Sequence, residues 1–152
     1  MKPLETTTEE VLRKAIQSEC DTRVYYQKLA ERAATPPVRK RLLDLADAQL
    51  LHRAKLERKY REEIGKDAPD PQTAIIEIPS EVTNLDMSHA LKLALEHERE
   101  SESFFRFQAE RVPNTDLGAL FWELAEIEWK HKTDLQAEYD ASADPEQFLR
   151  DI

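Results

Sequence analysis

The sequence predicts an all-α protein with four long helices, and three observations support this: proline spacing, glycine scarcity and apolar periodicity. The eight prolines stand at positions 3, 36, 37, 69, 71, 79, 113 and 145, which leaves long proline-free runs over 4–35, 38–68, 80–112 and 114–144. Proline breaks helix interiors, so each run has room for one uninterrupted helix. Only two glycines occur, and within each run apolar residues recur at the spacing of one helix face.

The first two helices have clear start and stop signals. The first is expected from about Thr8 to Ala33, because Thr7 can cap it and Glu10 completes a capping box. The second is expected after Thr35, with two prolines in its first turn, and it should stop at Gly65. On each helix, the residues expected to face the core form a stripe, called its inward stripe below. The inward stripes are Leu12, Ala15, Ile16, Glu19, Tyr26, Leu29 and Ala30 in the first helix, and Leu42, Leu45, Ala46, Gln49, His52 and Leu56 in the second.

The last two long helices follow the same pattern. The third is expected from near Asp86 to just before Pro113, and the fourth from near Thr115. Their inward stripes are Leu91, Ala94, Leu95, Glu98 and Phe105 in the third helix, and Leu117, Leu120, Phe121, Leu124, Glu128, His131 and Leu135 in the fourth. Asp144 and Pro145 then suit the cap and first residue of a short C-terminal helix.

The chain contains an internal repeat at an offset of 79 residues. The matching pairs are Leu12 with Leu91, Ala15 with Ala94, Glu19 with Glu98, Ala46 with Ala125, His52 with His131, Leu56 with Leu135 and Tyr60 with Tyr139. No gap is needed, so the repeat predicts two copies of a helix hairpin, at about 8–64 and 87–143, within a single domain over 1–152. The repeat also makes Gln49 the counterpart of Glu128.

The segment between the hairpins, residues 66–85, is long for a bundle loop. A helix of about 27 residues is about 40 Å long, and twenty extended residues reach about 65 Å. The segment can therefore run the length of a helix and start the third helix where the second began. One such crossover gives a ferritin-like four-helix bundle. We expect Ile75, Ile76 and Ile78 to lie against the helices.

Charge and composition narrow the function classes. The net charge is −9 with a pI of about 5.0, and no basic cluster occurs, which argues against a nucleic-acid partner. No stretch is apolar enough for a signal peptide or a membrane span. A single cysteine, Cys20, cannot form an internal disulfide, so a cytoplasmic location is expected.

Six chemically reactive positions fall inside the inward stripes: Glu19, Gln49, His52, Glu98, Glu128 and His131. Glu128 and His131 share a helix face because they stand three residues apart. Buried ionised groups are costly without compensation, and divalent cations would provide it. Carboxylate and imidazole ligands suit iron, manganese or zinc. Any one of these residues alone is commonly a packing or solvated residue, but five residues of ligand type in two-fold register favour a metal site.

The helices resemble those of rubrerythrin-type, ferritin-like di-iron proteins. The resemblance rests on AIQSECDTRVYYQKLAER, LADAQLLH, ALEHERESESFFRFQAER and LAEIEWKH, and it extends over about residues 8–140. It implies terminal metal ligands at Glu19 and Glu98, a bridging carboxylate at Glu128, and histidine ligands at His52 and His131. It also implies an iron centre that reacts with O₂ or peroxide, for peroxide reduction or for iron oxidation and storage.

Two features depart from that family pattern. The chain lacks the four cysteines of a rubredoxin module, so a peroxidase would need an external electron donor. Gln49 stands where a second bridging carboxylate is expected, and an amide is a weaker ligand, so an asymmetric site follows. Glu102, one turn beyond Glu98, can either replace that carboxylate or pair with its repeat counterpart Arg23. We favour the pair.

The function predicted from the sequence is that of a di-metal oxidoreductase. The alternatives are an iron-binding or storage protein without turnover, and a degenerate bundle with a structural or oligomerisation role. Apolar residues outside the main stripes predict a homodimer or a higher oligomer. They are Leu50, Leu51, Leu93, Phe104, Phe107 and Trp129.

Overall fold

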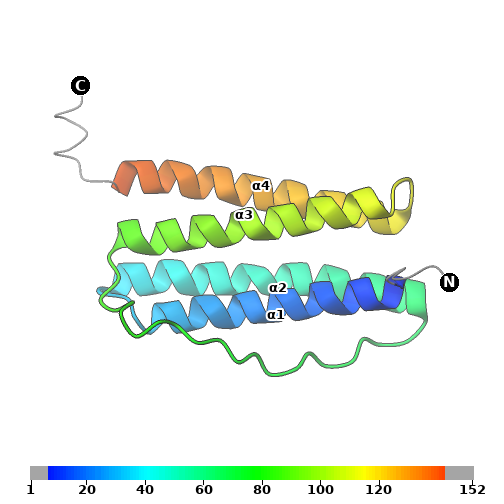
Figure 1. Cartoon of the computed structure of the whole chain (residues 1–152), viewed down its shortest axis with the longest axis horizontal. Coiled ribbons are helices and arrows are strands. Elements are labelled where there is room, and N and C mark those ends of the chain that lie inside the picture. The colour runs from blue at the N-terminus through cyan, green and yellow to red at the C-terminus, as the bar shows by residue number, and fades with distance from the viewer. Residues whose placement is uncertain (1–6, 143–152) are drawn as a thin grey trace. The chain divides into compact units, whose positions relative to one another are not determined.

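A computed structural model describes residues 7–142 of the chain. Its helices are α1 (Thr8–Ala30), α2 (Pro36–Ile64), α3 (Met87–Arg111) and α4 (Asp116–Ser142), as Figure 1 shows. The four predicted long helices are thereby confirmed. The short helix expected at Asp144 lies outside the described residues.

The chain divides into two compact units that follow the repeat. The first unit holds the residues up to Arg32 together with Arg39–Val82, and the second holds Ala33–Val38 together with the residues from Thr83 onward. The hairpin of α1 and nearly all of α2 thus lies in the first unit, and the hairpin of α3 and α4 lies in the second. The single domain stays a prediction.

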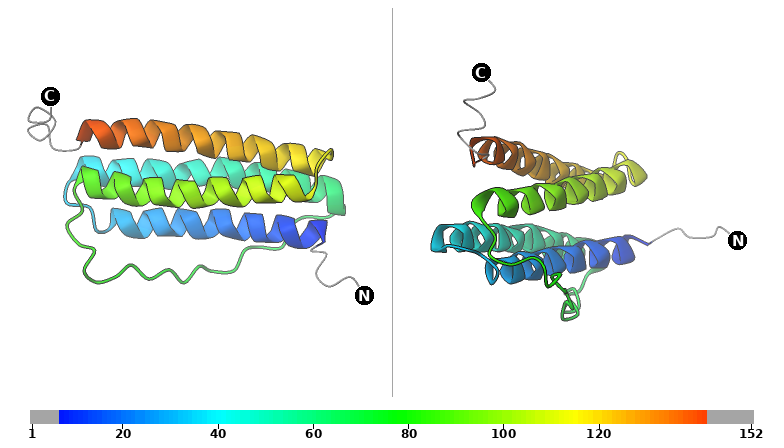
Figure 2. Two further views of the ribbon diagram at one scale, coloured as in Figure 1. Left: turned by 45° about the horizontal axis from the view of Figure 1, so that its top comes forward. Right: turned by 60° about the vertical axis from the view of Figure 1, so that its left-hand side comes forward.

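In the first unit, α1 and α2 lie side by side and run in opposite directions (Figures 1 and 2). The side chain of Thr7 accepts a hydrogen bond from the Glu10 N–H at 3.2 Å, which confirms the predicted cap. The hydroxyl of the fully buried Tyr60 donates to Glu9 at 2.8 Å, which ties the end of α2 to the start of α1. Gly65 ends α2 with a φ of 85°, a conformation that favours glycine.

Helix α1 ends three residues before the predicted Ala33. Its last helical residue is Ala30, and Ala33 instead forms a parallel bridge with Leu85. The N–H of Ala34 donates to the carbonyl of Leu85 at 2.8 Å. The backbone groups of this turn therefore bond to a segment far along the chain, and the helix stops to allow it.

The segment after α2 runs along α1 from end to end, as the predicted crossover requires (Figure 2). Gln17 exchanges two hydrogen bonds with the backbone of Gln72, Lys28 donates to the carbonyl of Ile76, and Arg32 donates to the carbonyl of Val82 at 2.6 Å. The contacts advance in the same direction along both segments. The crossover thus returns the chain to the α1–α2 turn, where α3 begins.

One expectation for this segment is wrong. Ile76 and Ile78 are partly buried, but Ile75 is 89% exposed. Successive side chains of an extended chain point to opposite sides, so a segment that turns Ile76 and Ile78 inward must turn Ile75 outward.

In the second unit, α3 and α4 form an antiparallel pair (Figure 1). The Asp86 side chain caps α3 by accepting from the His89 N–H at 2.8 Å. The rings of Phe105 and Phe121 stack between the two helices with centroids 6.2 Å apart. At the start of α4, Gly118 passes so close to the preceding turn that an added Cβ would lie 2.2 Å from the carbonyl oxygen of Val112. Only glycine fits there without a shift of the backbone.

None of the helices in residues 7–142 has an apolar stretch long enough to cross a bilayer.

Candidate metal-binding site

The first unit buries three of the predicted site residues. Glu19 on α1 and Gln49 and His52 on α2 are each 3% exposed. Nδ1 of His52 lies 3.4 Å from Oε2 of Glu19. The antiparallel pairing of α1 with α2 therefore brings together a carboxylate and an imidazole from residues that are 33 positions apart in the sequence.

The amide of Gln49 is bonded within its own helix. Its Nε2 donates to the carbonyl oxygen of Leu45, one turn earlier, at 3.1 Å in a buried position. A glutamate could not make this bond, because an ionised carboxylate has no proton to donate. Gln49 therefore satisfies its polar nitrogen without any metal ion.

The second unit carries the counterpart residues on α3 and α4. Glu98 is 1% exposed and Glu128 is fully buried, whereas His131 is partly buried. Glu128 and His131 offer an oxygen and a nitrogen within 4.8 Å of each other. The three-residue spacing on α4 sets this proximity. A buried carboxylate beside an imidazole fits a divalent iron, manganese or zinc ion.

Glu102 is bound by cations of its own unit. Arg106 donates to its Oε2 at 2.7 Å and Lys132 donates to its Oε1 at 2.6 Å. Burial by itself raises the pKa of Glu102, but the bonds from Lys132 and Arg106 outweigh it and hold the pKa below the ordinary value. The favoured pairing with Arg23, a residue of the first unit, stays a prediction. Arg106 was recognisable from its spacing four residues beyond Glu102, but Lys132 required the packing of α4 on α3.

The sequence stripes did not include His97, a partly buried residue next to Glu98 on α3. Burial lowers its pKa, and the opposite influence of the Glu100 and Glu128 carboxylates does not offset that effect. The lowered pKa favours the neutral form of this imidazole. Its only sequence signal is that it directly precedes Glu98.

Two aromatic residues of the inward-facing sets lie in the core, whereas the two tryptophans are about half exposed. Tyr26 and Phe105 are 0% and 1% exposed, which confirms a core role. Trp122 and Trp129 on α4 are each 48% exposed. Cys20 is a free, partly buried thiol.

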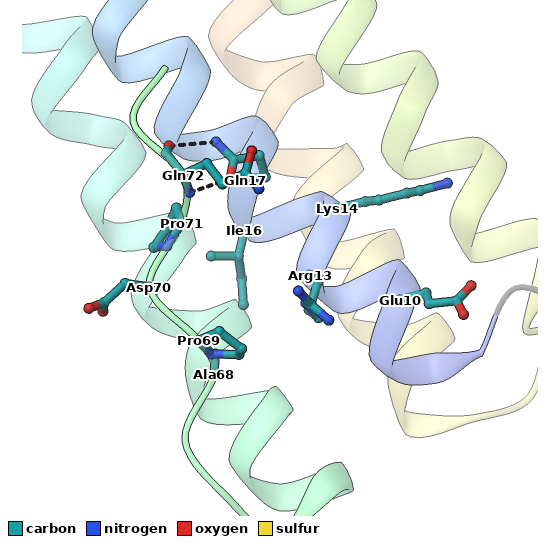
Figure 3. Close-up of a pocket in the computed structure, with 10 residues that line it drawn as sticks. All are labelled: Glu10, Arg13, Lys14, Ile16, Gln17, Ala68, Pro69, Asp70, Pro71 and Gln72. Atoms are coloured by element: carbon teal, nitrogen blue, oxygen red, sulfur yellow. Dashed lines mark hydrogen bonds between the residues drawn. The ribbon is translucent and has the colours of Figure 1, made fainter. Parts of the chain in front are cut away.

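The first unit also has a pocket of about 340 Å³ between α1 and the crossover segment (Figure 3). Figure 3 shows the paired bonds of Gln17 with Gln72 at one end of it. Arg13, Lys14 and Pro69 are among the residues that line it, and none of the predicted metal ligands does. The candidate metal site is thus separate from this surface pocket.

Comparison with known proteins now decides the family. The family model described as Rubrerythrin matches residues 10–139. The chain belongs to the rubrerythrin family. Membership confirms the all-α, ferritin-like four-helix-bundle fold class and indicates a di-iron carboxylate type of protein. With a single cysteine, the 152 residues hold no rubredoxin module of the four-cysteine kind.

Two solved structures resemble this member of the rubrerythrin family. A hypothetical protein from Pyrococcus furiosus is 26% identical, with a TM-score of 0.65 over 91% of this chain and 92% of that one. An uncharacterized conserved protein from Magnetospirillum magnetotacticum is 20% identical, with a TM-score of 0.71 over 91% of this chain and 97% of that one. The second likeness supports the fold alone. No curated protein matches the chain.

Proposed function

We propose that the protein is an iron-binding oxidoreductase of the rubrerythrin type that reduces peroxide or oxidises Fe(II). The chain would bind up to two metal ions. Their ligands would come from the predicted set of Glu19, Gln49, His52, Glu98, Glu128 and His131. Manganese and zinc suit the same ligands. A peroxidase role would require an electron donor from outside these 152 residues, because their single cysteine cannot form a four-cysteine rubredoxin module.

The observation that carries this proposal is the pair of Glu128 and His131. Glu128 is fully buried, and its neighbour across one helical turn offers a nitrogen within 4.8 Å. An ionised carboxylate in such a place costs several kcal/mol unless a cation or good hydrogen bonds compensate. A divalent ion bound by Glu128 and His131 would provide such a cation, which supports a metal-binding role for this core-facing glutamate.

The chain's own residues have distinct roles in this proposal. Glu98 and Glu128 supply negative charge, and His131 supplies a neutral nitrogen ligand. The buried apolar side chains Leu95, Leu124 and Leu135 limit access of water to this part of the second unit. When bound, iron supplies the one-electron couple between Fe(II) and Fe(III) that peroxide reduction or Fe(II) oxidation needs.

Metal analysis of protein purified from iron-supplied cells tests the proposal. We expect bound iron in the wild type and its loss in the double variant Glu128→Ala/His131→Ala. Glu126→Ala is the matched control, because Glu126 is an exposed glutamate on the same helix. The Fe(II)-loaded wild type should consume peroxide faster than the double variant. Full iron content in the double variant would contradict the assignment of the site.

A second function, metal binding without turnover, is favoured by Gln49. Its amide is engaged with its own helix, and it brings no charge to the site. Peroxide consumption separates the two functions: a protein that binds iron but leaves the peroxide rate at that of free Fe(II) is a binding or storage protein. A protein that binds no metal would fit a structural role for the bundle.

Exposed apolar side chains support the proposal of a homodimer. Leu50 and Leu51 on α2 are 40% and 70% exposed, and Phe107 and Trp129 are 57% and 48% exposed. Leu93 and Phe104 are partly buried. Light scattering at micromolar concentration should give at least twice the chain mass, and a clean 17.7 kDa particle would contradict the proposal. We also propose a cytoplasmic location, which suits the single free thiol of Cys20.

A further inference from the structure

The crossover segment contains a stretch with the burial pattern of a β-strand. From residue 73 to residue 78, exposed and partly buried side chains alternate. The partly buried ones are Ala74, Ile76 and Ile78, and the exposed ones are Thr73, Ile75 and Glu77. A period of two is that of an extended chain with one face against the protein. In the first unit this stretch runs along α1 (Figure 2).

The hydrogen bonds from α1 to this stretch use one edge of its backbone. Gln17 bonds to both the N–H and the carbonyl of Gln72, and Lys28 donates to the carbonyl of Ile76. In an extended chain, the N–H and carbonyl of one residue point to one side, and those of the next residue point to the opposite side. Positions 72 and 76 are an even number of residues apart, so their backbone groups share the edge toward α1.

The opposite edge of the stretch, called the outer edge below, carries the backbone groups of Thr73, Ile75 and Glu77. None of these groups has a hydrogen-bond partner among residues 7–142. The side chain of Ile75, the central residue, is 89% exposed. An extended segment with an unpaired backbone edge and an exposed apolar side chain is a template for pairing with another strand.

The sequence of the outer edge is complementary to itself in the antiparallel direction. When Ile75 lies opposite the same residue of a second copy, each Glu77 lies opposite a Thr73. The two apolar side chains then meet at the two-fold axis, and each carboxylate faces a hydroxyl that can donate to it. A parallel pairing in register would set the two Glu77 carboxylates against each other, which is unfavourable. The pattern therefore suits a second copy of this chain.

We propose that the outer edge is the contact surface of a homodimer, in which two copies pair as antiparallel strands about a two-fold axis at Ile75. The contact uses the same surface on both copies, so the assembly closes at two chains. The hydrogen bonds to α1 are kept, because they use the other edge. This inference rests on the homodimer proposed above and names its contact surface. The exposed Leu50 and Leu51 on α2 are the alternative surface.

Cysteine cross-linking tests the pairing and its register. Ile75→Cys and Thr73→Cys are oxidised separately and compared on non-reducing gels, with the wild type as control for the thiol of Cys20. Opposite Cα atoms in a hydrogen-bonded antiparallel pair lie about 5.5 Å apart, which a disulfide can span. The two copies of position 73 would be separated by at least about 13 Å, which it cannot span. We expect a covalent dimer for Ile75→Cys alone.

Sedimentation equilibrium tests the surface without a cross-link. Ile75→Lys should raise the dissociation constant of the dimer at least ~10-fold, because two ammonium groups would meet at the axis. Leu51→Lys is the matched control: it makes the same exchange of an apolar side chain for a charge at a residue that is 70% exposed, and it should leave the dissociation constant unchanged. Circular dichroism melting confirms that each protein is folded.

Three outcomes contradict the inference. If the wild type is a monomer, the proposed homodimer fails and the inference fails with it. If Leu51→Lys separates the dimer and Ile75→Lys does not, the homodimer stands but its contact surface lies on α2, and the inference fails alone. A Thr73→Cys protein that forms as much covalent dimer as Ile75→Cys would overturn the antiparallel register.

Discussion

Replacing Glu128 by glutamine should stabilise the metal-free protein and abolish its stabilisation by metal. Glu128 is fully buried, so in the metal-free state its charge is held away from water. The repeat shows how an amide fits at this place, since Gln49 at the matched position donates to the carbonyl one turn earlier. The equivalent acceptor for a glutamine at position 128 is the carbonyl of Leu124. The change therefore exchanges a buried charge for a satisfied amide of the same size.

The expected gain in the free energy of unfolding of the metal-free protein is about 2 kcal/mol, from the cost of a buried charge after partial compensation. For a chain of this length, that corresponds to a rise in melting temperature of about 4–8 °C. With metal bound, the wild type should become more stable than Glu128→Gln. An ion at 100 times its dissociation constant adds about 2.7 kcal/mol to the wild type and nothing to a variant that cannot bind it.

The assay is circular dichroism melting at pH 8, where histidine is ordinarily neutral, with chelator and then with excess Co(II). Glu126→Gln is the control, because an exposed change of the same kind should alter the free energy of unfolding by less than about 0.5 kcal/mol. A Glu128→Gln protein that melts below the wild type in chelator would refute the reasoning about buried charge. One that gains as much from Co(II) as the wild type would refute the role of Glu128 as a ligand.

Three further changes test the structure away from the metal ligands. Glu102→Gln should lower the free energy of unfolding by about 1–2 kcal/mol at pH 7. The pKa of Glu102 is lowered in the folded state, so its contribution to stability is present above the ordinary glutamate pKa and is lost as the pH falls through the folded value. Urea unfolding should therefore show the difference in stability between the wild type and Glu102→Gln becoming smaller in acid. Burial and the hydrogen bond to Glu9 raise the pKa of Tyr60. The contribution of Tyr60 to folding stability is therefore full below the ordinary tyrosine pKa and is lost as the pH rises through the folded value. Tyr60→Phe should therefore cost about 1 kcal/mol at pH 7 and show a smaller loss of stability in alkali, and an unchanged alkaline profile would contradict this. Gly118→Ala should destabilise the protein by about 1–3 kcal/mol and lower its melting temperature, because the new methyl group meets the Val112 carbonyl. A melting temperature equal to that of the wild type would show that the turn can move freely.

The sequence by itself determined the order of the four helices and the helix faces that carry the candidate metal ligands. Thr7 begins the first hairpin through a local hydrogen bond, and Gly65 ends it through its backbone preference. Neither effect needs a distant partner. The spacing of Glu128 and His131 puts both on one face of α4, because 3.6 residues complete a turn. Local rules of this kind act within a few residues and are therefore readable from the chain alone.

The tertiary structure decided what depends on distant partners. Helix α1 ends at Ala30 because the residues after it bond to Leu85, and no local signal announces that partner. Lys132 reaches Glu102 across 30 positions, which only the packing of α4 on α3 arranges. Hydrogen bonds and charge pairs of this kind are short-ranged in space but unrelated to distance along the sequence, so periodicity identifies the face on which a side chain lies but not the group that it meets there.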